Sequence, residues 1–128
     1  YKNNKENFAG YYAQIIQRLK QIQPRAKFFL MTMAKDGEND SRLEEKQAHS
    51  ALLYDFADKF DNTYVIDLLK YAPTYDEKFK ENFYLCGHMN PMGYDLTAKM
   101  VASYIDYIIR HNPQDFKEVG FIGTDLHG

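Results

Sequence analysis

The sequence predicts an α/β domain with parallel strands, and three observations indicate it. Residues 27–33 (KFFLMTM) and 63–69 (TYVIDLL) are short apolar runs, as expected for strands buried on both faces of a sheet. Three longer segments have apolar residues at the spacing of amphipathic helices. Helices and strands alternate along the chain, and parallel strands require crossover helices of this kind.

The first helix is expected to start near Asn3 and Glu6, which form a pair similar to a capping box. It ends before Pro24, because a proline ring interrupts a helix. The strand at residues 27–33 follows. The apolar stripe of this first helix consists of Phe8, Tyr11, Tyr12, Ile15, Ile16, Leu19 and Ile22.

A polar loop, residues 34–41, leads to the second helix, for which Ser41 and Glu44 form a capping box. The second strand comes next, and residues 70–82 are expected to be a long loop. The apolar face of the second helix consists of Leu52, Leu53, Phe56, Ala57 and Phe60.

The third helix is expected to begin with Asn90 as N-cap and Pro91 at the first helical position, where the missing N–H costs nothing. Asn112 and Pro113 end it. Residues 119–123 (VGFIG) are either a short strand or a packed tail. The buried stripe of the third helix consists of Val101, Tyr104, Ile105, Ile108 and Ile109.

Composition narrows the class of protein. The 128 residues suit one domain, and 16 basic against 18 acidic residues offer no broad attraction for nucleic acid. The single cysteine, Cys86, provides neither a disulfide framework nor a structural zinc set. No signal peptide and no apolar run of membrane-spanning length are visible, so a soluble protein is expected, in the cytoplasm or secreted.

Two strands are too few for a parallel sheet, and three amphipathic helices have more apolar surface than two strands cover. Residues 1–128 are therefore expected to be the C-terminal portion of a single larger α/β domain. Alternatively, a second copy completes the sheet. In both cases the strand at residues 27–33 should have a neighbour besides the second strand.

His88 is the candidate functional residue. It follows the second strand and precedes a helix, and ligands of α/β domains bind beyond the carboxyl ends of the strands. Its imidazole is suited to act as a general base and acid. The alternative is an ordinary histidine at a helix entrance.

The segment GHMNPMGY, residues 87–94, resembles the last sequence block of the SGNH (GDSL-type) hydrolases. In that family a histidine precedes the final helix, an Asn or Pro follows, and Gly-Tyr or Gly-His comes next. Residues 64–71 (YVIDLLKY) and 25–33 (RAKFFLMTM) are similar to the last two strands of the family, and the resemblance covers residues 6–110.

The resemblance implies a flavodoxin-like three-layer α/β/α sandwich with a parallel sheet. It implies a serine esterase or acylhydrolase acting on a carboxylic ester, either an acylated carbohydrate or a small ester. His88 would activate the serine, and the oxyanion hole would come from the serine N–H, a glycine and an asparagine. The family needs no metal and no organic cofactor.

Two departures from the family pattern stand out. The serine, glycine and asparagine blocks normally lie upstream, so this segment lacks its nucleophile. The family places an aspartate three residues before the histidine, where this chain has Leu85. Asp67 is a possible substitute, although a structural role is favoured for it, and Asp76 is a weaker candidate. The remaining serines are in N-cap or mid-helix settings: Ser41, Ser50 and Ser103.

Other reactive side chains are interpreted as structural. Cys86 is expected to be buried rather than nucleophilic, because side chains separated by one residue rarely face each other. His49 is expected to be solvated, and His111 to suit the last turn of the third helix. With His127 in the tail, the histidines lack zinc-ligand spacing. Tyrosines between residues 71 and 84 either line a carbohydrate cleft or pack the loop.

Two further hypotheses stay open beside the enzyme. The first is a non-catalytic α/β binding or interaction domain with a degenerate triad, which the absent aspartate favours mildly. The second is a receiver-type domain, which needs an acidic cluster after its first strand and a lysine after its last. Neither of those patterns is present.

Overall fold

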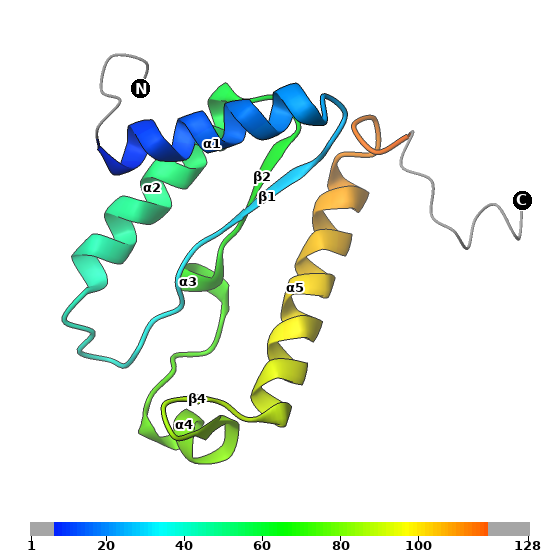
Figure 1. Ribbon diagram of the computed structural model, residues 1–128. Coiled ribbons are helices and arrows are strands. Elements are labelled where there is room, and N and C mark those ends of the chain that lie inside the picture. The colour runs from blue at the N-terminus through cyan, green and yellow to red at the C-terminus, as the bar shows by residue number, and fades with distance from the viewer. Residues whose placement is uncertain (1–6, 118–128) are drawn as a thin grey trace, which may run out of the picture. The chain divides into compact units, whose positions relative to one another are not determined.

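The computed structural model describes residues 7–117, which divide into two compact units at the end of α4. The elements of the N-terminal unit, up to Asn82, are α1 (Phe8–Ile22), β1 (Phe28–Met31), α2 (Leu43–Lys59), β2 (Thr63–Ile66), α3 (Leu68–Tyr71) and most of α4 (Glu77–Phe83). The elements of the C-terminal unit are β3 (Tyr84–Leu85), β4 (His88–Met89) and α5 (Pro91–His111) (Figure 1). Helices mixed with a small parallel sheet make the chain broadly α/β, as predicted.

The strands β1 and β2 pair in parallel, with α2 as the crossover between them (Figure 1). Phe28 lies opposite Thr63, and Met31 lies opposite Ile66. The backbone N–H of Thr32 extends the ladder by donating to the Ile66 carbonyl at 3.0 Å. The predicted parallel pair is confirmed, and within residues 7–117 its sheet has two strands.

One apolar core joins α1, α2 and one face of this sheet. Leu30 and Val65 are opposite each other in the register, so their side chains point to the same face. Phe56 of α2 is completely buried, and the Tyr12 ring of α1 stacks on it with centroids 5.3 Å apart. The buried members of this core are Ala13, Ile16, Leu30, Leu53, Phe56 and Val65.

The prediction that both strands are buried on both faces is wrong for β1. Three of the four β2 residues are buried, but in β1 only Leu30 is, and Met31 is 42% exposed. A ribbon of two strands is too narrow to shield both of its faces, so an apolar run does not guarantee burial.

The helix starts differ in part from the predictions. The pair Asn3 and Glu6 lies outside the described residues, and the N-cap of α1 is Asn7, whose side chain accepts from the Gly10 N–H. The Ser41 capping box is wrong, because α2 starts one residue later and has no side-chain cap bond. Asp40 instead accepts the N–H of Arg42 at 2.9 Å.

The second strand ends earlier than predicted. β2 ends at Ile66, and the next residue, Asp67, is the N-cap of α3. Leu68 and Leu69 of the predicted strand are therefore helical. The expected loop at residues 70–82 contains most of α4, which Asp76 caps by accepting the Phe79 N–H at 2.8 Å. Asp76 and Glu77 favour a helix start at this point. The segment is too short to show the repeated apolar spacing by which the longer helices are predicted.

The third predicted helix is confirmed as α5. Asn90 is its N-cap and Pro91 its first residue. All five residues of the predicted stripe are buried or half-buried, while Ala102, Ser103 and Asp106 between them are exposed. Residues 119–123 lie outside the described part. Among residues 7–117, no helix combines the length and the hydrophobicity that a membrane crossing requires.

Candidate functional site

His88 lies on a β-hairpin that the sequence did not predict. The strands β3 and β4 are antiparallel, and a turn of two residues, Cys86 and Gly87, joins them. Both turn residues have positive φ angles, 51° and 84°, as a type I′ turn requires. The His88 side chain is exposed at the first position after this turn.

The backbone on the helix side of His88 is locked by the Asn90 cap. The Asn90 side chain accepts the Gly93 N–H at 2.9 Å, and the Asn90 N–H donates to the Phe83 carbonyl at 2.8 Å. A Cβ on Gly93 would lie 2.4 Å from that same carbonyl oxygen and 3.1 Å from the Met89 Cβ. Asn90 and Gly93 of the motif therefore hold the hairpin close against the first turn of α5.

The His88 imidazole has no such structural role. Within residues 83–117 its side chain makes no hydrogen bond, ion pair or ring contact. A histidine with an exposed, unengaged ring on a locked backbone can exchange protons with a bound molecule. The structure thus separates the motif into two residues that fix the turn and one that is free to react.

Leu85, where the family has an aspartate, lies directly across the hairpin from His88. Cross-strand neighbours have their Cβ atoms about 5 Å apart, so a carboxylate at this position would reach the imidazole. The Leu85 side chain is exposed and cannot accept a hydrogen bond from the imidazole. The departure from the family pattern therefore falls on the residue beside the candidate base.

Asp67 belongs to the N-terminal unit and has a structural role there, as favoured. Its Oδ1 accepts from the Thr32 hydroxyl and from the Lys70 N–H, both at 3.1 Å. Its Oδ2 accepts from the Tyr54 hydroxyl at 2.7 Å. The side chain is buried, and its two oxygens together link the end of β1, α2 and α3. The weaker candidate, Asp76, caps α4.

Sequence reasoning missed the partners of Asp67. Thr32 and Asp67 each follow the last residue of a parallel strand, so both lie at the carboxyl edge of the sheet. The Thr32 hydroxyl also accepts the Leu69 N–H at 2.9 Å. The available signal was one polar residue inside each apolar run, near its C-terminal end, because the carboxyl ends of parallel strands meet at one edge. Tyr54 had no such signal.

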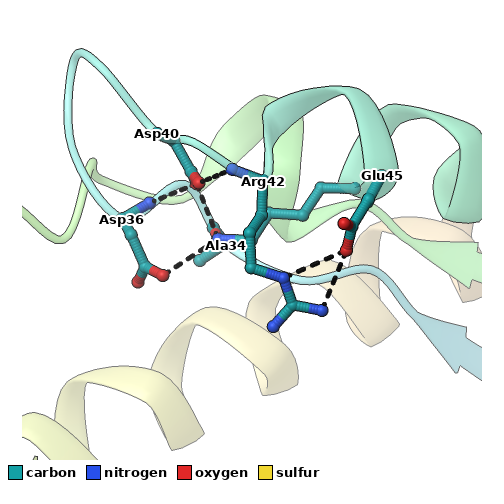
Figure 2. A network of polar contacts seen from close by, with 6 residues as sticks. Ala34, Asp36, Asp40, Arg42 and Glu45 are labelled. Carbon is teal, nitrogen blue, oxygen red and sulfur yellow. Dashed lines mark hydrogen bonds and ion pairs between the residues drawn. The ribbon is translucent and has the colours of Figure 1, made fainter.

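A second polar network ties the loop between β1 and α2 to the helix (Figure 2). The Lys46 ammonium donates to the Ala34 carbonyl at 2.8 Å, to Asp40 at 2.7 Å and to Asp36 at 3.2 Å. Lys46 is buried, and all three of its N–H groups are used. Arg42 and Glu45 form an exposed ion pair beside it.

The charges of this network stabilise each other. The Asp36 N–H, the Lys46 side chain and the Arg42 N–H hold the pKa of Asp40 far below its ordinary value. Burial lowers the pKa of Lys46, but the bonds to Asp40 and Asp36 outweigh it, so the pKa lies above its ordinary value. Both groups are held in their charged forms. This suits ion pairs that fix the loop, and it does not suit groups that exchange protons.

The serines lack the setting of a nucleophile, as expected. Ser41 is exposed before α2, and Ser103 is exposed on α5. Ser50 is mid-helix and buried, and its hydroxyl has no hydrogen-bond partner among residues 7–117. The neighbouring His49 differs in part from its prediction: it is only partly solvated, because its Nδ1 is buried and its ring centroid lies 5.5 Å from that of Phe8.

Cys86 and His111 lie at opposite ends of the C-terminal unit's chain segment, in the hairpin turn and in the last turn of α5. Cys86 is exposed rather than buried, because it occupies the turn of the hairpin. His111 lies in the last turn of α5, as predicted, with Nδ1 at 2.8 Å from the Tyr107 carbonyl and its ring stacked on Tyr107. His127 lies outside the described residues. Tyr75 is buried and stacks on a neighbouring ring, which favours loop packing for that tyrosine.

Among residues 7–117, no three His, Cys, Asp or Glu side chains come together in a way that could hold a metal ion. The candidate site is therefore His88 with its supports Asn90 and Gly93. No family model, curated protein or solved structure matches the chain, so its chemistry is inferred from its own residues.

Proposed function

We propose that this chain is the C-terminal part of an SGNH-type serine esterase or acylhydrolase in which His88 is the general base. One observation carries the proposal: His88 is exposed and unengaged within its unit, while Asn90 and Gly93 of the same motif lock the backbone around it. A histidine that stabilises nothing in its own unit is available for proton transfer.

The proposed fold is a flavodoxin-like α/β/α sandwich, of which the parallel pair β1 and β2 would be the last two strands. The crossover through α2 supports it, because parallel strands linked in this way are the repeating unit of such folds. The polar residues Thr32 and Asp67 at the carboxyl edge also suit a domain that binds its ligand there.

In the proposed reaction, the His88 imidazole takes the proton of a serine hydroxyl supplied by residues outside this chain. The serine oxygen attacks the ester carbonyl, and His88 returns the proton to the leaving alcohol. Water then hydrolyses the acyl-enzyme with the same histidine as base. Since Leu85 replaces the usual aspartate and Asp67 is engaged elsewhere, a backbone carbonyl would orient the imidazole.

The test uses the protein that carries this chain together with the residues preceding Tyr1. Hydrolysis of p-nitrophenyl acetate should fall at least about 100-fold in His88→Ala, the loss expected for a general base. His111→Ala is the matched control, because His111 is also exposed but binds the Tyr107 carbonyl. Equal rates in the two variants would refute the role of His88.

The chain by itself should not hydrolyse the ester, since none of its described serines has the setting of a nucleophile. Turnover by the isolated chain that disappears in His88→Ala would place the nucleophile within these residues instead.

The second candidate function is a non-catalytic binding or interaction domain of the same fold. The specific observation in its favour is Leu85 across the hairpin from His88, where the family has its acid. A fluorophosphonate, which labels activated serines, separates the two candidates. Labelling of the longer protein supports the esterase, and absence of labelling with an intact fold supports the binding domain.

A further inference from the structure

The helix α1 has two apolar faces. Its buried face, with Ala13 and Ile16, packs into the core of the N-terminal unit. A second row of large apolar side chains, each 46–59% exposed, runs along the neighbouring face from the first to the last residue of the helix. We define this row as the α1 stripe: Phe8, Tyr11, Ile15, Leu19 and Ile22.

The α1 stripe is a continuous surface. At 100° per residue, its five members fall within an arc of about 80°, next to the arc that packs into the core. A helix with one partner needs a single apolar stripe, and exposed apolar patches of this size mark interaction sites. The stripe contains no charged residue, so it is suited to burial.

We propose that the α1 stripe is an interface between two copies of this chain, with the two helices antiparallel. The spacing carries the choice of partner: the other four members lie four and seven residues on either side of Ile15. A two-fold axis at Ile15 therefore places Ile15 against Ile15, Tyr11 against the second copy's Leu19, and Phe8 against its Ile22. An isologous dimer requires this self-complementarity.

The area of the interface agrees with a weak but specific dimer. Five large side chains, each about half exposed, offer on the order of 500 Å² of apolar surface per copy. Two copies bury about 1,000 Å², the lower bound for a biological interface. The flanking polar arc adds Gln14 and Arg18 at the rim.

The charges favour the antiparallel orientation over the parallel one. Helix α1 has no acidic residue, and its two cations, Arg18 and Lys20, lie in its C-terminal half. In an antiparallel pair the two Arg18 side chains are separated by about 9 Å along the axis, and each lies near the second copy's Tyr11. A parallel pair would bring the arginines and the like ends of the helix dipoles together.

Sedimentation velocity of the chain from about 1 to 100 µM tests the interface. The wild type should convert from monomer to dimer in this range. Ile15→Glu should raise the dimer dissociation constant at least about 100-fold, because the two-fold axis brings two carboxylates together in an apolar interface. Gln14→Glu adds the same charge one residue away, at the rim, and should still dimerise.

Disulfide trapping identifies the symmetry. In a Cys86→Ser background, Ile15→Cys should form a cross-linked dimer under mild oxidation, and Gln14→Cys should not, because only position 15 faces its own copy. A wild type that stays monomeric to about 100 µM overturns the proposal. So does an Ile15→Glu variant that dimerises like the wild type, which would indicate another surface, such as the open edge of β1. This interface is independent of the proposed chemistry.

Discussion

The two units of the chain handle their polar side chains in opposite ways. In residues 7–82 two ionisable side chains are buried and engaged: Asp67, at the end of β2, accepts three hydrogen bonds, and Lys46 of α2 donates three. In residues 83–117 the side chain of the candidate base, His88, is exposed and makes no hydrogen bond there. A polar group committed to stability is therefore not available for chemistry.

The units also differ in how they hold their residues in place. The N-terminal unit uses a packed core around Phe56 and Leu53. In the C-terminal unit, the buried residues among 83–117 are few: Gly93, Ile108 and Phe116. The C-terminal unit instead uses local backbone devices, namely a tight turn, a helix cap and a glycine contact. Packing fixes one unit, and short-range backbone geometry fixes the other.

The largest expected effect tests the packed core. Phe56→Ala should lower the free energy of unfolding of the N-terminal unit by about 3–5 kcal/mol, because it leaves a cavity among buried side chains. Urea denaturation followed by circular dichroism measures the change. Met92→Ala, which shortens an exposed side chain of α5, is the control and should cost less than about 0.5 kcal/mol. If both variants lowered the free energy of unfolding by similar amounts, the core around Phe56 would not be what holds the N-terminal unit together.

The Lys46 network should give the next largest effect. Lys46→Met keeps most of the side-chain volume but leaves Asp40 and the Ala34 carbonyl without the ammonium. The melting temperature at pH 7 should fall by roughly 5–10 °C. Lys59→Met breaks an exposed ion pair with Asp55 and should change it by about 1 °C or less.

The pH dependence of this effect follows from the two pKa directions. The folded pKa of Asp40 is lowered, so its contribution is complete above the ordinary carboxyl pKa of about 4 and is lost as the pH falls further. The folded pKa of Lys46 is raised, so its contribution is complete below about 10 and is lost at higher pH. The melting temperatures of the wild type and of Lys46→Met should therefore approach each other at low pH and at high pH. A difference in melting temperature that stays constant from pH 2 to 11 would refute the role of the network.

The glycine contact gives a smaller and local effect. Gly93→Ala should weaken the hairpin and the first turn of α5 by about 1–3 kcal/mol, because the new Cβ meets the Phe83 carbonyl oxygen. Hydrogen exchange of the Asn90 and Tyr94 amides measures it, since both donate in this region. Gly37→Ala is the matched control, because nothing lies within 4 Å of its Cβ. Unchanged exchange in Gly93→Ala would show that the contact does not hold the turn.

The smallest effect tests the turn before His88. Cys86→Asn should stabilise the hairpin by about 0.5–1 kcal/mol, because Asn-Gly is the preferred pair for a type I′ turn and Asn tolerates a positive φ. Slower exchange of the Asn90 amide is the expected readout. Cys86→Ala removes the thiol without this preference and should give no gain. A gain from alanine equal to that from asparagine would attribute the effect to the thiol.

Several features were predictable because they depend on neighbours in the chain. Asn90 and Pro91 mark the start of α5 by local rules of helix capping, and the apolar spacing gives its stripe. The same spacing predicted the core residues Leu53 and Phe56, since one face of a helix must be buried. The parallel pairing of β1 and β2 followed from the helix between them.

Other features required contacts between distant residues. Lys46 binds the carbonyl of Ala34 and two carboxylates from the preceding loop, and no local pattern indicates that a lysine is buried there. Asp67 caps α3 by a local rule, but its bonds to Thr32, which follows β1, and to Tyr54 of α2 join residues far apart in the sequence. The motif made His88 a candidate. Only the tertiary structure showed that Asn90 and Gly93 are used to hold the turn and that the imidazole is not, because hydrogen bonds and close contacts depend on which groups folding brings together.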